Sequence, residues 1–208
     1  MILVLGGSGC GKSAYAESRI QELASRAGGR LYYLATMQVY GKEGIRKVER
    51  HKMLRQGKGM HTVEQTRNVS DVIRQINCEG AFVLLEDLGN LTANELFPAE
   101  EEQSTAAEAG NEGNAGNNWN MTNREWRTAQ KIWAQLRELD EAVSGLVIVS
   151  NNVFEGGIRY EDGTRGYQRV LGYLHGRIAE AALETVEMTA GLPTVIKRKA
   201  QVEKRTEA

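Results

Sequence analysis

A glycine-rich segment close to the N-terminus combines the residue types that bind the phosphates of a nucleotide. Glycines let successive backbone N–H groups curve around an anion, and a helix that starts after them adds its partial positive charge. In the pattern G-x-x-x-x-G-K-[ST], the lysine reaches the β- and γ-phosphates and the hydroxyl ligates Mg²⁺. The residues that fit this pattern are Gly6, Gly7, Ser8, Gly9, Cys10, Gly11, Lys12 and Ser13. We expect all eight to wrap around the phosphates of ATP or GTP, with Lys12 as a catalytic group.

A second acidic group is expected at the end of another strand, because a P-loop needs one to hold the metal ion or its waters. Residues 81–85 form an apolar run that predicts a buried strand, and Glu86 and Asp87 follow it directly. Ligands of open parallel sheets bind beyond the carboxyl ends of the strands. We favour Glu86 as the metal ligand beside Ser13. Asp87 is the alternative, and it could instead cap the next helix.

A histidine and an arginine share one face of a helix predicted over residues 43–55. His51 and Arg55 stand four residues apart, which brings two side chains together on a helix. A neighbouring guanidinium disfavours the charged imidazolium, so the imidazole would stay neutral and nucleophilic near pH 7. Taken alone, the pattern is more typical of a solvated surface helix. His61 and His175 are interpreted as structural histidines.

Strand and helix signals alternate along the chain, and these elements must position the groups above. Apolar runs predict strands at residues 2–5, 31–35, 60–63, 81–85 and 146–149. Helical spacing predicts helices over residues 12–27, 43–55, 69–76, 123–143 and 167–181. The turn signal at residues 190–193 predicts a terminal hairpin between residues 185–189 and 194–197. The alternation predicts an α/β fold with a mainly parallel sheet flanked by helices.

Composition limits the class of protein. The 208 residues suit a single domain over 1–208, and 41% hydrophobic residues suffice for a core. Lys and Arg total 26 against 27 Asp and Glu, so the net charge of −1 argues against a protein that coats nucleic acid or lipid. No apolar run suggests a signal peptide or membrane insertion, so we expect a cytoplasmic location. Residues 98–120 are acidic and rich in Asn and Gly, which predicts a disordered insertion.

Further blocks make the chain resemble the bifunctional adenosylcobinamide kinase/adenosylcobinamide-phosphate guanylyltransferases of cobalamin biosynthesis. The family's R-I-x-x-H-x-x-x-R block is matched from Lys47 through His51 to Arg55, and its T-x-E by Thr62 and Glu64. The other matches are Leu34-Ala-Thr36, Leu84-Leu-Glu86 with Asn94, Ser150-Asn151, Gly157-Ile158, Glu161, Arg165, Gly191-Leu-Pro193 and Lys197. The chain departs from the pattern at Asn152, where the family has Glu, and at His175-Gly176, where it has Asn-Gln.

The resemblance implies a RecA-like P-loop NTPase fold with a C-terminal β-hairpin, assembled as a trimer. It implies that ATP or GTP phosphorylates the aminopropanol hydroxyl of adenosylcobinamide. It also implies that GTP guanylylates a histidine, by position His51, and that GMP then passes to adenosylcobinamide phosphate to give adenosylcobinamide-GDP. Mg²⁺ would assist. The residues implied to line the GTP site besides the P-loop are Ala35, Thr36, Met37, Lys52, Arg55, Glu64 and Glu86.

Two other functions stay open on the residues alone. The chain could be another small-molecule P-loop kinase in which His51 is incidental. It could also be a regulatory nucleotide-binding protein that changes shape and transfers nothing. The block from His51 to Arg55 favours a transferase, because a switch protein does not need it.

Overall fold

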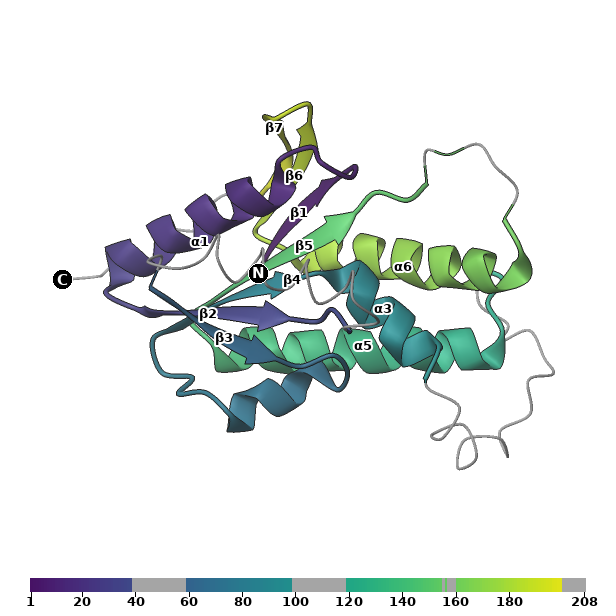
Figure 1. Cartoon of the computed structure of the whole chain (residues 1–208), viewed down its shortest axis with the longest axis horizontal. Helices are drawn as coiled ribbons and strands as arrows, with labels where there is room; N and C mark the ends of the chain where they lie inside the picture. Colours follow the sequence, from purple (N-terminus) through teal and green to yellow (C-terminus); the bar gives the residue numbers. More distant parts are fainter. Residues whose placement is uncertain (39–58, 99–118, 155, 157–159, 200–208) are drawn as a thin grey trace, which may run out of the picture.

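A seven-stranded sheet forms the centre of the protein, in the order β3-β2-β4-β5-β1-β6-β7. The computed structural model describes residues 1–38, 59–98, 119–154, 156 and 160–199. Neighbouring strands are parallel except β6 and β7, which form an antiparallel hairpin (Figure 1). The strands are β1 (Ile2–Gly6), β2 (Arg30–Ala35), β3 (Met60–Glu64), β4 (Ala81–Glu86), β5 (Gly145–Asn151), β6 (Glu184–Thr189) and β7 (Leu192–Arg198). The helices among the described residues are α1 (Lys12–Ala27), the 3₁₀ helix η1 (Val69–Arg74), α3 (Leu88–Leu96), α5 (Asn123–Ala142) and α6 (Asp162–Ala181).

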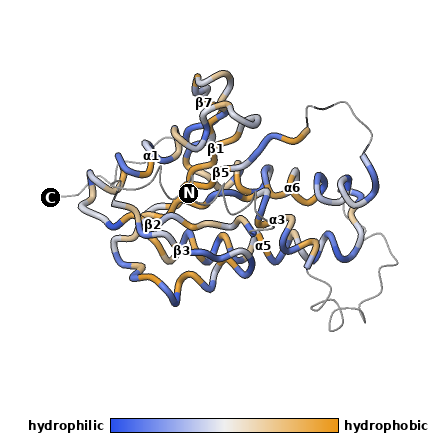
Figure 2. Tube along the Cα trace, viewed as in Figure 1, coloured by the Kyte–Doolittle hydropathy of each residue, from blue (hydrophilic) through white to orange (hydrophobic). Residues whose placement is uncertain are grey.

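Both faces of the sheet are covered, and the strand residues alternate between them. Ile2 and Val4 of β1 pack in one cluster with Ile20 of α1. Leu3, between them, faces the opposite cluster, which α3, α5 and α6 complete. Figure 2 shows hydrophobic residues gathered along the central strands, whereas the helices alternate between hydrophobic and hydrophilic positions. The period of two along each strand therefore divides the core into two layers.

The carboxyl ends of the six parallel strands, β1 to β6, meet along one edge of the sheet. The register pairs Gly6 of β1 with Asn151 of β5, and Ala35 of β2 with both Glu86 of β4 and Glu64 of β3. Residues that follow these strands therefore lie along the same edge although they are far apart in the sequence. This edge is where open parallel sheets bind ligands.

The predicted α/β class, the parallel sheet and the terminal hairpin are confirmed. The segment at 69–76 differs, because Val69–Arg74 forms a 3₁₀ helix and not a longer regular helix. The helix predicted over 43–55 and most of the insertion predicted over 98–120 lie outside the described residues. Within the described part of the chain, no helix is both long and apolar enough to cross a membrane.

Candidate active site

The glycine-rich loop connects β1 to the first turn of α1. Gly9 and Gly11 adopt φ values of 73° and 91°, in the left-handed region that favours glycine. Gly11 is the residue before the helix, and the helix start carries no side-chain cap. Unsatisfied N–H groups at such an N-terminus are what an anion binds. The turn of the C-terminal hairpin braces the loop, because the Gly191 amide donates to the Cys10 carbonyl at 3.0 Å.

Gly6 is required for a close approach between the loop and β6. A Cβ at this position would lie 2.6 Å from the Met188 carbonyl oxygen and 2.5 Å from the Cys10 sulfur. The Cys10 side chain itself is half-buried and packs against the core layer under α1. Cys10 therefore fills the space under the loop that Gly6 leaves open.

The Lys12 side chain folds back over the loop. Its ammonium donates a hydrogen bond to the Gly7 carbonyl at 3.0 Å, and the residue is only 7% exposed. Burial raises the pKa values of Glu86 and Asp87, and the positive charge of the same ammonium partly offsets that rise. Lys12 thus supplies a fixed positive charge between the loop and the end of β4.

Ser13 of α1 and Glu86 of β4 face each other. The Ser13 hydroxyl donates to Glu86 Oε1 at 2.5 Å, while Glu86 Oε2 is buried and has no hydrogen-bond partner among the described residues. Burial raises the pKa of Glu86 to about 7, and the nearby Asp87 adds to the shift. A divalent cation would reverse this shift and would use the unpartnered oxygen.

The donor set at this point fits Mg²⁺. Mg²⁺ usually takes one or two carboxylates together with waters and substrate phosphates, and does not need a cage of protein ligands. Within the described ranges, no group of three or more His, Cys, Asp or Glu gathers as a metal site. Ser13 and Glu86 are the residues that would hold the ion.

The end of β2 is tied to the end of β4 at the same edge. The buried Thr36 donates its hydroxyl to the Asp87 carbonyl at 2.7 Å, and its amide donates to the Glu86 carbonyl at 3.1 Å. The side-chain amide of Asn94, on α3, donates hydrogen bonds to the Thr36 carbonyl at 2.8 Å and to the Thr66 carbonyl at 2.9 Å. Ala35 and Met37 flank Thr36 and are half-buried. These contacts give the hydroxyl of Thr36 a structural partner.

Glu64, which the resemblance placed at the GTP site, does not lie beside the loop. Glu64 ends β3 and is exposed, and three strands separate β3 from β1. Four strand spacings correspond to about 19 Å, so Glu64 lies too far away to contact the phosphates held by Lys12. His51, Lys52 and Arg55 lie outside the described residues.

Asp87, the alternative acid at the end of β4, caps α3 as the sequence analysis allowed, and it contacts Asn151 at the end of β5. Asp87 accepts from the Asn90 amide at 2.6 Å, so it caps α3, and its other carboxylate oxygen accepts from Asn151 Nδ2 at 3.2 Å. Burial raises the pKa of Asp87 and also raises the pKa of the nearby Tyr167 to about 12. Asn151 ends a buried strand, which is the signal that could have found it. Nothing local marks Tyr167.

His175 lies on α6 and contacts Ser150 near the end of β5. Its Nε2 is 2.7 Å from the hydroxyl of the buried Ser150, and its ring meets Phe154 edge-on. Burial lowers the pKa of His175 to about 4. A neutral imidazole held by packing agrees with the structural role expected for it.

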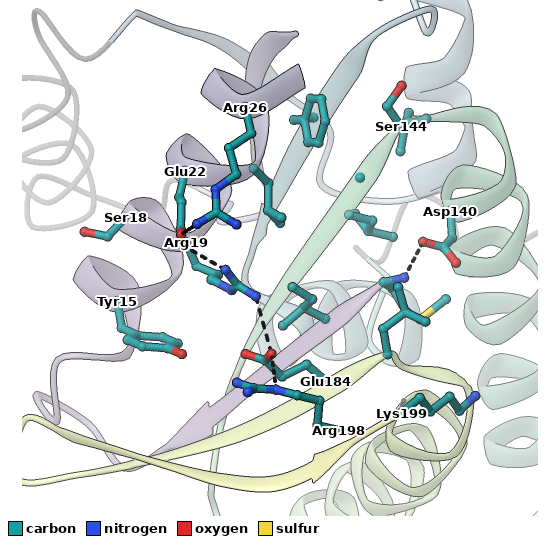
Figure 3. A pocket seen from close by; sticks show the side chains of 18 residues that line it. Tyr15, Ser18, Arg19, Glu22, Arg26, Asp140, Ser144, Glu184, Arg198 and Lys199 are labelled. Atoms are coloured by element: carbon teal, nitrogen blue, oxygen red, sulfur yellow. Dashed lines mark hydrogen bonds and ion pairs between the residues drawn. The ribbon is translucent and has the colours of Figure 1, made fainter. Parts of the chain in front are cut away.

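A large cavity lies at the opposite edge of the sheet, where the strands begin. It has a volume of about 1110 Å³ and lies between α1, the hairpin and the loop before β5 (Figure 3). Its charged groups pair with one another, since Glu184 Oε2 accepts from Arg198 at 3.0 Å and from Arg19 at 3.4 Å. The N-terminal ammonium pairs with Asp140 at 2.8 Å. These ion pairs join the hairpin to α1 and β1 to α5, far from the loop.

Comparisons with known proteins agree with the motif order. The model of the family "cobinamide kinase / cobinamide phosphate guanyltransferase" matches residues 2–196, from β1 into β7. The bifunctional adenosylcobalamin biosynthesis proteins CobU of Escherichia coli and Salmonella typhimurium are each 26% identical to the chain over 199 residues, covering 95% of it and 99% of their own length. A KaiC-like protein from Pyrococcus horikoshii, known by crystal structure, aligns with a TM-score of 0.41 and 13% identity over 89% of this chain and 69% of its own. Because the family model spans nearly the whole chain, the protein belongs to the cobinamide kinase / cobinamide phosphate guanyltransferase family.

Proposed function

We propose that this enzyme carries out two successive transfers on a corrinoid. It phosphorylates the hydroxyl of adenosylcobinamide, and it then moves GMP from GTP onto adenosylcobinamide phosphate through a guanylyl-His51 intermediate. The product is adenosylcobinamide-GDP. The observation that carries the proposal is the family match over residues 2–196, in a chain whose P-loop is followed by the block from His51 to Arg55.

The phosphate-binding end of the site supports the phosphoryl transfer. Backbone N–H groups of the loop and the start of α1 would hold the β- and γ-phosphates of ATP or GTP. Lys12, already fixed over the loop, would neutralise charge on the oxygens of the transferred group. Mg²⁺, when bound by Ser13 and Glu86, supplies further positive charge beside the phosphates.

The guanylyl transfer would use His51 as the nucleophile. A neutral imidazole nitrogen attacks the α-phosphorus of GTP, a P–N bond forms, and the bond to the β-phosphate breaks with release of pyrophosphate. An oxygen of adenosylcobinamide phosphate then attacks the same phosphorus and the P–N bond breaks. Lys12 would stabilise the negative charge of the leaving pyrophosphate. The residues proposed to line the GTP site besides the loop are Ala35, Thr36, Met37, Lys52, Arg55, Glu64 and Glu86.

We also propose that the chain assembles as a trimer and acts in the cytoplasm. The hairpin supports self-association, because β7 exposes Leu192 by 71%, Ile196 by 57% and Val195 by 44%. Exposed apolar side chains in one strand are typical of a surface that another chain covers. Sedimentation analysis would show a species of three times the chain mass, and a monomer at micromolar concentration would contradict the trimer.

The test of the guanylyl-histidine is a labelling experiment. The protein is incubated with α-labelled GTP, denatured and washed, and protein-bound label is measured after acid and after alkali. Label that is lost in acid and kept in alkali indicates a phosphorus–nitrogen bond. His51→Ala should abolish it, and His61→Ala is the matched control. An unlabelled wild type, or equal labelling of His51→Ala, would refute the intermediate.

A further inference from the structure

A second, smaller cavity lies directly beside the P-loop, and no step proposed above uses it. Its volume is about 280 Å³. The loop contributes Ser8, the region after β4 contributes Asp87 and Asn90, the region after β5 contributes Asn151 and Asn152, and α6 contributes Tyr167. The cavity therefore shares a wall with the triphosphate clamp.

The alternation of side chains along β4 places the two acids at its end on opposite faces of the sheet. Phe82 and Leu84 pack under α1, whereas Val83 and Leu85 pack on the opposite face of the sheet. The alternation continues past the strand, because Glu86 reaches Ser13 of α1 and Asp87 reaches α3 and β5. One acid thus lies on the metal side of the clamp, and the other lines the cavity.

Asp87 is held in a fixed orientation in that wall. Its Oδ1 accepts the Asn90 amide and its Oδ2 accepts Asn151 Nδ2. The Gly89 backbone also hydrogen-bonds this carboxylate. Because a carboxylate oxygen has two lone pairs, Oδ2 can accept one further hydrogen bond. The wall is also fixed to the P-loop strand, because the Asn152 amide donates to the Gly6 carbonyl at 2.9 Å. Asp87 therefore keeps a set position relative to the loop.

We propose that this cavity receives the hydroxyl end of the phosphoryl acceptor, and that the Asp87 carboxylate takes the proton of that hydroxyl. The inference rests on the proposed kinase activity. The hydroxyl oxygen forms a bond to the γ-phosphorus, and the bond from the γ-phosphorus to the bridging oxygen breaks. The electron pair leaves with the nucleoside diphosphate, and the hydroxyl proton moves to Asp87 and then to solvent.

The size of the cavity indicates which part of the acceptor enters. Pockets for drug-sized ligands measure roughly 300–1,000 Å³, so about 280 Å³ holds an amino-alcohol arm but not a corrin ring. The ring would stay outside, where Phe154 follows Val153 of the cavity wall. Phe154 and Trp119 lie together over Gly172 of α6 and are 45% and 44% exposed. Exposed aromatic rings beside a polar cavity suit a large amphipathic planar group.

Asn152 lines the same cavity as Asp87 and carries no charge. Among the described residues that line the cavity, Asp87 is therefore the one carboxylate, and it is supplied from the end of β4, the strand beside β5.

The test uses Asp87→Asn and Asp87→Ser in the full chain. Asn and Ser both cap helices well, so α3 should keep its first turn while the proton acceptor is lost. Phosphorylation of adenosylcobinamide by γ-labelled ATP or GTP should fall in kcat by roughly 10²–10⁴-fold. Transfer of GMP from α-labelled GTP to adenosylcobinamide phosphate should persist at the wild-type rate. Asp71→Asn, an acid-to-amide change on η1, is the matched control.

The outcomes separate this inference from the function on which it rests. A wild type that phosphorylates no adenosylcobinamide would refute the kinase proposal itself. An active wild type with undiminished kcat in both Asp87 variants would overturn the role of Asp87 alone. Loss of both transfers together would also overturn it, because a purely structural residue behaves in that way. Phe154→Ala should raise KM for the corrinoid and leave kcat unchanged. An unchanged KM would refute the proposed position of the corrin ring beside Phe154.

Discussion

Replacing His175 with asparagine should remove a defined part of the pH dependence of folding stability. Burial lowers the pKa of His175 to about 4, against 6.5 for the unfolded chain. The unfolded chain therefore binds a proton that the folded chain excludes. Stability from this group is complete above pH 6.5, and it is lost as the pH falls from 6.5 towards 4.

The magnitude follows from these two pKa values. Between pH 7 and pH 5 the neutral imidazole should account for a loss of about 2 kcal/mol in the free energy of unfolding. Asparagine can still bond the hydroxyl of Ser150, which lies 2.7 Å from the imidazole nitrogen, and it does not titrate. The difference between the wild type and His175→Asn isolates the histidine, because every other titrating group, Glu86 included, is common to both proteins.

Urea unfolding monitored by tryptophan fluorescence at pH 7, 6 and 5 would measure this difference. His175→Asn should lose about 2 kcal/mol less than the wild type across this range. His61→Asn, the same change at an exposed position of β3, is the matched control. Parallel pH profiles for the wild type and His175→Asn would refute the reasoning, since they would mean that the folded chain accommodates the imidazolium at no cost.

Three further substitutions test the clamp and the core. Lys12→Ala should abolish binding of labelled GTP, while Lys199→Ala at the opposite edge should not, and undiminished binding by Lys12→Ala would rule out its phosphate contact. Gly6→Ala should lower the free energy of unfolding by about 1–3 kcal/mol and weaken nucleotide binding, because the new methyl meets the Met188 carbonyl. Gly7→Ala meets nothing within 4 Å and serves as its control, so equal stability of the two variants would contradict the crowding. Glu125→Ala should cost about 2 kcal/mol in urea unfolding, because it removes both the capping box of α5 and the paired hydrogen bonds of 2.9 and 2.7 Å from Arg169. Glu125→Gln, which keeps an oxygen for the cap, should lose less, and equal losses would mean that the charge alone matters.

The sequence by itself determined the local elements of the site. The loop pattern predicted a helix from Lys12 to the glycines after Ala27, and α1 has those bounds. The apolar run before Glu86 predicted β4, because a continuous buried strand needs no partner to be recognised. Such signals are local, since capping, turn chemistry and the period of apolar residues act within a few positions.

Only the tertiary structure decided which of the two acids after β4 lies beside Ser13 and which lines the smaller cavity. Glu86 and Asp87 were alternatives for one role in the sequence. In the fold they point to opposite faces of the sheet, Glu86 to Ser13 and Asp87 to Asn151. The contact between Gly191 and Cys10 is also a result of the tertiary structure. The Gly191 amide donates to the carbonyl of Cys10, although the two residues lie near opposite ends of the sequence. These contacts depend on the order and register of the strands. Parallel strands are joined by long crossover connections, so no local sequence pattern shows which strands become neighbours.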